Sequence, residues 1–128
     1  MKNARLIILF IFTLLLSAAC GGSGGAGDPA ETVEAYMQAK AASDADTIRQ
    51  LLCSEMEGVM EREVLTFESV SDVHIEGMSC QQVGDSDAVS CTGKIVATYG
   101  TEDTEFPLAS YRVVQEDGEW KWCGEAAP

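Results

Sequence analysis

The sequence predicts an α+β fold in which N-terminal helices pack on an antiparallel sheet of about four strands. Two observations carry this prediction. Apolar residues between positions 29 and 64 recur at helical spacing, whereas the chain from about residue 67 onward is rich in β-branched and aromatic residues divided by turn-forming clusters. The chain has 128 residues, which is the length of one domain, and we assign that domain to residues 29–128.

The helical half opens with a strong start signal. Asp28 suits the capping position, Pro29 the first helical position and Glu31 the first turn. The apolar face of this helix is formed by Val33, Tyr36, Met37 and Ala41. Residues 43–46 then predict a turn that caps a second helix, whose apolar residues are Ile48, Leu51, Leu52 and Met56.

A third, weaker helix is indicated further along the chain. Its apolar residues are Val59, Met60 and Val64. The glutamates of this stretch are expected on its solvated side: Glu57, Glu61 and Glu63.

The sheet half predicts strands at about 72–83, 88–99, 105–115 and 119–124. Three turn clusters separate them, and the last contains the Asp-Gly pair typical of two-residue hairpins. Gly77 and Gly93 are candidate positions for a bulge that bends the sheet, and Pro107 fits a strand start or a bulge. The hairpin register places four large residues on one face: Tyr111, Val113, Trp120 and Trp122.

Residues 1–19 have the three parts of a secretory signal peptide: a basic start, an apolar run and small residues at the end. The run is shorter than the roughly 20 residues that a membrane-spanning helix needs. With Cys20 directly after Ala18 and Ala19, the segment resembles the lipobox of bacterial lipoproteins, although Ser17 stands where that family usually has Leu. The resemblance implies that Cys20 carries the lipid, palmitate included, and becomes the new N-terminus. The alternative is an ordinary signal peptide.

A lipid-anchored location in the bacterial cell envelope, outside the cytoplasm, follows from this leader. Residues 20–28 comprise the lipidated cysteine and a flexible Gly-rich linker. Loss of residues 1–19 removes two basic residues, Lys2 and Arg5, and no acidic one, so the net charge of −13 becomes −15. A chain this acidic is repelled by phosphate backbones, and we expect no nucleic-acid partner.

The remaining four cysteines predict two disulfides, because their number is even and the chain is exported. A hairpin turn centred between Asp85 and Ser86 places Cys80 opposite Cys91, which leaves Cys53 for Cys123. A zinc site built from the same cysteines is the alternative. Their spacing contains no C-x-x-C and the chain has one histidine, so we expect neither a metal nor a cofactor.

The order of elements resembles the NTF2-like (cystatin-like) superfamily, and within it the small bacterial lipoproteins of unknown function of the DUF4878 type. The resemblance is carried by the helix–acidic turn–helix opening around residues 33–53 and by the closing strand 118–123, with its D-G-x-W-x-W pattern. It covers about residues 29–124. It implies a strongly curved sheet wrapped around the first helix, which makes a cone with a pocket.

Some members of this superfamily are ketosteroid-isomerase-like or polyketide-cyclase-like enzymes that use a carboxylate in the pocket. The residues that the resemblance offers for a pocket here are Tyr36, His74, Tyr111, Trp120 and Trp122. Glu76 and Glu105 are the nearest candidates for the carboxylate, but both fit surface positions better. No catalytic residue is therefore assigned.

We expect a membrane-anchored, non-enzymatic domain that binds a protein or a small apolar ligand. Two alternatives stay open: an isomerase- or cyclase-like enzyme that uses the interior of the cone, and a purely structural envelope protein.

Overall fold

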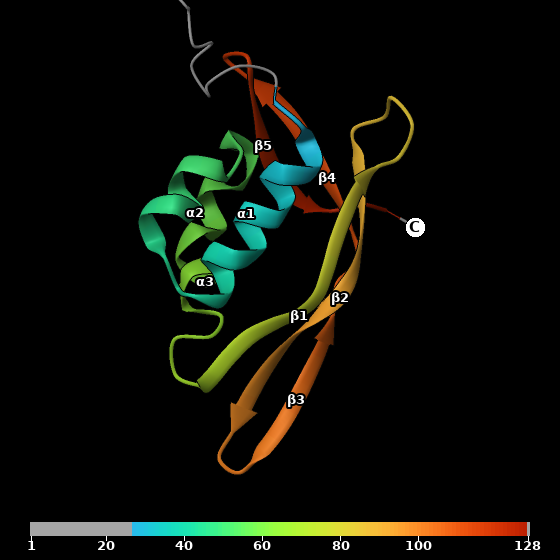
Figure 1. Ribbon diagram of the computed structural model, residues 1–128. Coiled ribbons are helices and arrows are strands. Elements are labelled where there is room, and N and C mark those ends of the chain that lie inside the picture. The colour runs from blue at the N-terminus through green and yellow to red at the C-terminus, as the bar shows by residue number, and fades with distance from the viewer. Residues whose placement is uncertain (1–26, 128) are drawn as a thin grey trace, which may run out of the picture.

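The computed structural model of the chain describes residues 27–127. The predicted signal peptide, Cys20 and most of the linker lie outside these residues. Within them, three helices pack together on one face of a curved antiparallel sheet, which is the expected α+β architecture (Figure 1). None of the helices in this part of the chain has both the length and the apolar composition needed to cross a membrane.

The first helix, α1 (Pro29–Ala41), starts where the sequence predicted, with the Asp28 carboxylate accepting a hydrogen bond from the backbone N–H of Ala30. The second, α2 (Ala45–Leu51), is capped in the same way by Asp44. A 3₁₀ helix, Ser54–Val59, leads into the short helix α3 (Met60–Leu65). Carboxylate caps satisfy backbone donors that a helix start leaves free, which explains the sharp beginnings of α1 and α2.

The sheet contains five strands rather than about four. They are β1 (Ser71–Gln82), β2 (Ala88–Tyr99), β3 (Glu102–Pro107), β4 (Ser110–Glu116) and β5 (Glu119–Glu125). The single strand predicted for 105–115 is two strands, and Pro107 ends the first of them rather than starting a strand. The long strand β2 pairs along one edge with β1 and along the other with β3 and then β4.

The division occurs at Leu108 and Ala109, where the chain steps from one part of β2 to the next. The N–H of Leu108 donates to the Gly93 carbonyl, and the Ala109 carbonyl accepts from the N–H of Cys91. Gly93 has a φ of 100°, and a Cβ there would lie 2.6 Å from the carbonyl oxygen of Glu76. Glycine is therefore required where β1 and β2 approach, opposite the bulge that follows Glu76 in β1.

The main core lies between α1, α2 and the β2–β4–β5 part of the sheet. Its fully buried side chains include Val33, Tyr36, Ile48, Val89 and Val113. A smaller cluster at the far end of β2 contains Phe67, Ile95 and Ala97. The register of β4 and β5 sets Val113 opposite Trp122 and Gln115 opposite Trp120, as the hairpin signal predicted.

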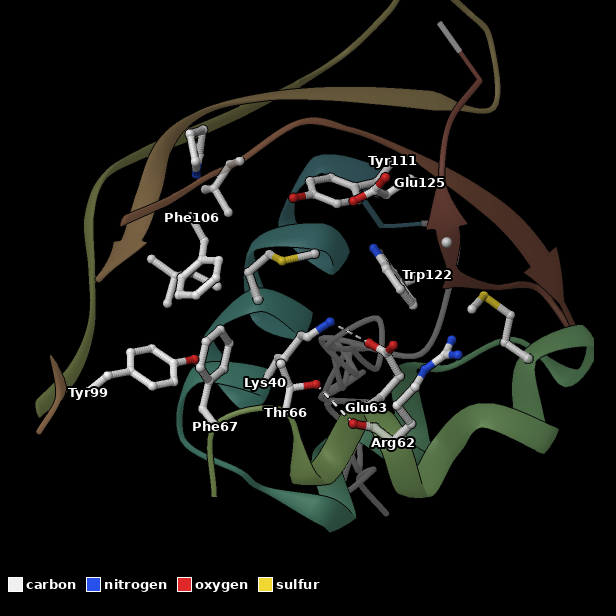
Figure 2. A pocket seen from close by; sticks show the side chains of 16 residues that line it. Lys40, Arg62, Glu63, Thr66, Phe67, Tyr99, Phe106, Tyr111, Trp122 and Glu125 are labelled. Atoms are coloured by element: carbon white, nitrogen blue, oxygen red, sulfur yellow. Dashed lines mark hydrogen bonds and ion pairs between the residues drawn. The ribbon is translucent and has the colours of Figure 1, made fainter. Parts of the chain in front are cut away.

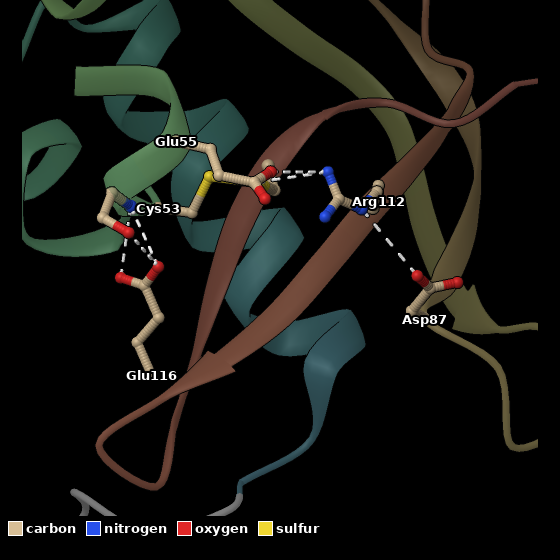
Figure 3. Close-up of a disulfide and its surroundings, with 7 residues drawn as sticks. Cys53, Glu55, Asp87, Arg112 and Glu116 are labelled. Atoms are coloured by element: carbon tan, nitrogen blue, oxygen red, sulfur yellow. Dashed lines mark hydrogen bonds and ion pairs between the residues drawn. A yellow bond between two sulfur atoms is a disulfide. The ribbon is translucent and has the colours of Figure 1, made fainter.

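Two disulfides join Cys53 to Cys123 and Cys80 to Cys91, which are the pairs that the sequence predicted. Cys80 and Cys91 are direct partners across β1 and β2. The other bond ties the end of the second helix to β5 over a separation of 70 residues (Figure 3). Disulfides of this kind indicate an oxidising compartment outside the cytoplasm.

The region around this second disulfide is reinforced by ionic contacts. Glu116 accepts hydrogen bonds from the backbone N–H and hydroxyl of Ser54, at 3.0 and 2.7 Å. The Arg112 guanidinium of β4 pairs with Glu55 at 2.9 Å and with Asp87 at 3.8 Å. Figure 3 shows Arg112 between these two carboxylates. The carboxylates thus connect the 3₁₀ segment to the closing hairpin on the side of the sheet away from the main core.

Candidate functional site

A pocket of about 390 Å³ opens between the helices and the inner face of the curved sheet (Figure 2). Its volume lies within the range of small-molecule sites, about 300–1,000 Å³. Residues from α1, the 3₁₀ segment, α3 and all strands except β1 contribute to its lining, namely Met37, Lys40, Met56, Arg62, Glu63, Thr66, Phe67, Ile95, Tyr99, Phe106, Pro107, Leu108, Tyr111, Trp122, Gly124 and Glu125.

The walls are largely aromatic. At one end Phe67 packs edge-on against Phe106, with ring centroids 5.5 Å apart, and Tyr99 lies beyond at 6.3 Å from Phe106. At the other end Tyr111 and Trp122 are 6.1 Å apart. Tyr99 and Phe106 keep 45% and 36% of their surface exposed, so the outer end of the pocket presents uncovered apolar rings to solvent. Such rings are typical of ligand sites.

The charged group at the base of the pocket is Glu63, which is only 6% exposed. The prediction that Glu63 faces solvent is therefore wrong. Its Oε2 accepts a hydrogen bond from the Lys40 ammonium at 2.7 Å and another from the Tyr36 hydroxyl at 3.0 Å. The face of α3 that bears Glu63 turns toward α1, and Lys40 lies in the last turn of α1, so the two short elements bring opposite charges together (Figure 2).

The two buried tyrosines of the site stay protonated. Burial, reinforced by the negative charge and hydrogen bond of Glu63, raises the pKa of Tyr36 far above its usual value. Burial likewise raises the pKa of Tyr111, whose hydroxyl oxygen accepts a hydrogen bond from the N–H of Ala109. The Tyr36 hydroxyl is thus a permanent donor to Glu63 at physiological pH.

Trp122 joins the core to the pocket. Its ring stacks on Tyr36 with centroids 4.0 Å apart and planes 10° from parallel, and the Lys40 ammonium lies 5.9 Å from its centroid. Its Nε1 is buried and has no hydrogen-bond partner, the one such side-chain atom within residues 27–127. In Figure 2 this nitrogen turns toward the pocket on the side of Tyr111.

The residues proposed for a pocket from the sequence do not all meet. Tyr111 and Trp122 line the pocket, and Tyr36 lies directly beneath it through its bond to Glu63. His74 is on the exposed outer part of β1, where it bonds to the Asp72 carbonyl and the Glu76 carboxylate. Placing His74 in the main pocket was wrong, because its side chain points to the surface.

Trp120 also lies outside the main pocket. It shares a face of β5 with Trp122 but packs under α1 and α2, where it lines a separate hollow with Leu51 and Lys121. The helices cover this part of the strand and leave only the Trp122 part open to the pocket. Glu76 and Glu105 are exposed and share an ion pair with Lys94, which agrees with the surface positions expected of them.

The sequence interpretation missed Glu63, Lys40 and the aromatic residues Phe67, Tyr99 and Phe106. One signal was present for Glu63. It interrupts a row of apolar residues at helical spacing, formed by Met56, Met60 and Phe67. A charged residue in such a row means either that the apolar face has been assigned wrongly or that the carboxylate is buried and paired with another group.

The geometry offers little for a metal ion. Among residues 27–127, the one group of possible ligands within reach of each other is Cys53, Glu55 and Cys123. Both sulfurs of this group belong to a disulfide, so neither is a thiolate ligand.

Comparison with known proteins places the fold. No family model matches the chain, and no curated protein matches it in sequence. Solved structures do match. A SEC-C motif containing protein from Rhodopseudomonas palustris is similar at a TM-score of 0.56 and 16% identity, over 81% of this chain and 82% of that one.

Two NTF2-like proteins are similar as well. One, from Streptomyces avermitilis and named as a proposed dehydratase, has a TM-score of 0.53 and 14% identity over 76% of this chain and 93% of its own. The other, from Rhodospirillum rubrum and of unknown function in nutrient uptake, has a TM-score of 0.50 and 16% identity over 77% and 96%. The fold is thus an NTF2-like α+β cone, and the low identities carry no activity across.

Proposed function

We propose that this domain binds a small, mainly apolar molecule in the aromatic pocket and does so without turnover. The observation that carries the proposal is the pocket itself: an open space of about 390 Å³ with aromatic walls and one buried ion pair at its base. Apolar walls supply affinity through burial, and a few fixed polar groups orient the ligand.

The uncovered rings at the outer end support a ligand rather than a packing defect. Tyr99 and Phe106 come from neighbouring strands joined by a short turn, and both rings stay partly exposed at the outer end of the pocket. A bound apolar molecule would cover both rings and pack against Phe67. The NTF2-like fold of the structural neighbours, in which a curved sheet encloses a pocket, is consistent with this role.

The test is the binding of a neutral apolar dye, N-phenylnaphthylamine, followed by its fluorescence. Thr66 is exposed and lines the pocket, so Thr66→Tyr should obstruct the entrance without disturbing the core. Thr101→Tyr, in the β2–β3 turn and away from the pocket lining, is the matched control. We expect Thr66→Tyr alone to weaken binding. Equal binding by both variants and the unmodified chain would place the dye elsewhere and contradict the proposal.

We further propose that the chain is a lipoprotein held at a membrane through Cys20. Two observations support the proposal. The lipobox-like segment precedes Cys20, and the four cysteines of residues 27–127 all pair with each other. Cys20→Ser should move the protein from the membrane fraction to the soluble fraction of the exported material. Unchanged partitioning would count against lipid on Cys20.

An isomerase-like enzyme is the second candidate, because Glu63 is a buried carboxylate beside the pocket. The Lys40 and Tyr36 donors both contact Oε2, and within residues 27–127 no hydrogen bond reaches Oε1, which is the atom that would take a proton from a ligand carbon. Exchange of the methyl protons of an aryl methyl ketone in D₂O tests this directly. Exchange that is lost in Glu63→Gln would favour the enzyme, and no exchange would favour binding alone.

A further inference from the structure

The buried indole N–H of Trp122 lacks a hydrogen-bond acceptor among residues 27–127. Trp122 is 3% exposed and its Nε1 has no hydrogen-bond partner, the one such atom within the described part of the chain. A buried donor left unpaired is unfavourable, and native proteins rarely keep one without a role or a bound group. The donor belongs to a residue that lines the pocket.

The neighbouring side chains do not supply the missing acceptor. Lys40, whose ammonium lies 5.9 Å from the indole centroid, offers only donors. The Tyr36 hydroxyl, although its ring stacks on the indole, is directed to Glu63. The Tyr111 hydroxyl oxygen accepts a hydrogen bond from the N–H of Ala109 and none from the indole.

One wall of the pocket therefore presents donors that no acceptor in the described part of the chain engages. An ammonium has three N–H groups, and the hydrogen bonds of the described residues engage one of those of Lys40, with Glu63. The remaining N–H groups of Lys40 in α1 and the indole N–H of Trp122 in β5 are thus free donors on the same wall of an otherwise apolar pocket. A molecule that fills the space and supplies an acceptor oxygen would satisfy both.

We propose that the ligand of this pocket is an apolar molecule with a neutral carbonyl oxygen, which accepts a hydrogen bond from Trp122 Nε1 and lies near the Lys40 ammonium. This inference rests on the proposed function and specifies its ligand class. The carbonyl end faces Trp122, and the apolar remainder lies along Phe67, Phe106 and Tyr99.

A neutral oxygen fits better than a carboxylate because the charges of the lining are already balanced. Lys40 and Arg62 are matched by Glu63 and Glu125, and the Lys40–Glu63 pair is in contact at 2.7 Å. An anionic ligand would add an unmatched charge beside two carboxylates in a chain whose net charge is −13. A carbonyl uses the free donors without that penalty.

The experiment follows the two indole N–H resonances of the full-length chain in ¹H–¹⁵N NMR spectra, with Trp120→Phe to assign them. The probes are matched in shape: acetylnaphthalene, isopropenylnaphthalene, in which carbon replaces the carbonyl oxygen, and naphthoate. The monocyclic pair acetophenone and isopropenylbenzene covers a smaller size. Thr66→Tyr, which narrows the pocket, separates binding there from binding elsewhere on the chain.

We expect each ketone to bind about tenfold more tightly than its hydrocarbon partner, the effect of one added hydrogen bond. The Trp122 indole proton should move downfield with the ketone only, and the Trp120 proton should stay in place. The Trp122 shift is measured in the chain without any substitution, so the result does not depend on whether a variant folds.

Other outcomes overturn the inference and separate it from the proposed function. Equal binding of ketone and hydrocarbon, with no shift at Trp122, contradicts the carbonyl and leaves the apolar pocket standing. Tightest binding by naphthoate contradicts the neutral ligand. If no probe binds, or if Thr66→Tyr leaves the binding of all five unchanged, both the ligand class and the proposed binding function fail.

Discussion

Two groups of charged side chains lie on opposite sides of the sheet and differ mainly in what surrounds them. In the pocket, Glu63 pairs with Lys40 and Tyr36, and the two charged side chains are 7% and 19% exposed. On the outer surface His74, Glu76, Lys94 and Glu105 form a longer chain of contacts, in which the His74 and Glu76 side chains are about half exposed. We call these the pocket network and the outer network.

The difference shows that residue type alone does not mark a functional site. The outer network contains the one histidine and more carboxylates, yet its side chains are exposed and water screens their charges. The pocket network has fewer charges, but apolar and aromatic groups surround them. Interactions there are strong because they are shielded, and removal of one partner leaves another charge uncompensated.

The largest expected effect comes from Lys40→Met. The substitution leaves the Glu63 carboxylate buried without its counter-ion and should lower the free energy of unfolding by about 3 kcal/mol. Lys94→Met is the matched change in the outer network and should have no measurable effect, because its partners are exposed to solvent. Urea unfolding at neutral pH measures both. Equal losses in the two variants would show that burial does not distinguish the networks.

Tyr36→Phe should give the next largest effect. It removes the hydroxyl that donates to Glu63 and keeps the ring that stacks on Trp122, so the expected loss is about 2 kcal/mol, typical of a hydrogen bond to a charged group. Tyr99→Phe, at an exposed ring, should leave stability unchanged. A Tyr36→Phe variant as stable as the unmodified chain would mean that Glu63 does not depend on this donor.

Alkaline pH provides a third test of the pocket network. Burial, reinforced by the charge of Glu63, raises the folded pKa of Tyr36, so the folded chain keeps a proton that the unfolded chain releases above the ordinary tyrosine pKa of 10.0. The protonated Tyr36 hydroxyl therefore contributes fully to the free energy of unfolding below that pH. This contribution is lost as the pH rises, by at most about 1.4 kcal/mol per pH unit. Stability should fall more steeply above this point in the unmodified chain than in Tyr36→Phe. Parallel pH profiles would contradict the assignment.

The smallest effect belongs to His74. The hydrogen bond to the Asp72 carbonyl, followed by the one to the Glu76 carboxylate, raises the pKa of His74 above its ordinary value of 6.5. A raised pKa stabilises the folded state at pH values below 6.5, and this contribution is lost as the pH rises through the folded value. His74→Asn should remove a slight gain in thermal stability under mildly acidic conditions. Ligand binding in the pocket should not change with His74, and a change would connect the two networks.

Much of the fold was predictable because local signals agreed with tertiary packing. Acidic residues ahead of α1 and α2 located the helix starts, and the distance of Cys80 and Cys91 from the turn between them indicated their pairing. The division of the third predicted strand was not predictable, because it depends on the contact of Leu108 and Ala109 with a distant part of β2. Tertiary hydrogen bonds of this kind leave no local pattern.

The site was harder to predict than the fold for a related reason. Glu63 looks like any glutamate of an amphipathic helix until the position of α1 is known, since only then does Lys40 approach it. Tyr111 and Trp122 were found because large residues on one strand face commonly point inward. Trp120 fits the same pattern but lies where helices cover the sheet. His74, which only the family resemblance suggested, lies where the sheet is exposed.

The most direct test of the central claim is the position of a bound ketone in the full-length chain. Intermolecular NOEs from the methyl and ring protons of acetylnaphthalene would report which side chains lie beside it. We predict NOEs to Trp122 and Tyr111 from the methyl group and to Phe67 and Phe106 from the naphthalene ring. NOEs confined to other surfaces of the domain, with the Trp122 indole proton unshifted at saturation, would contradict the account.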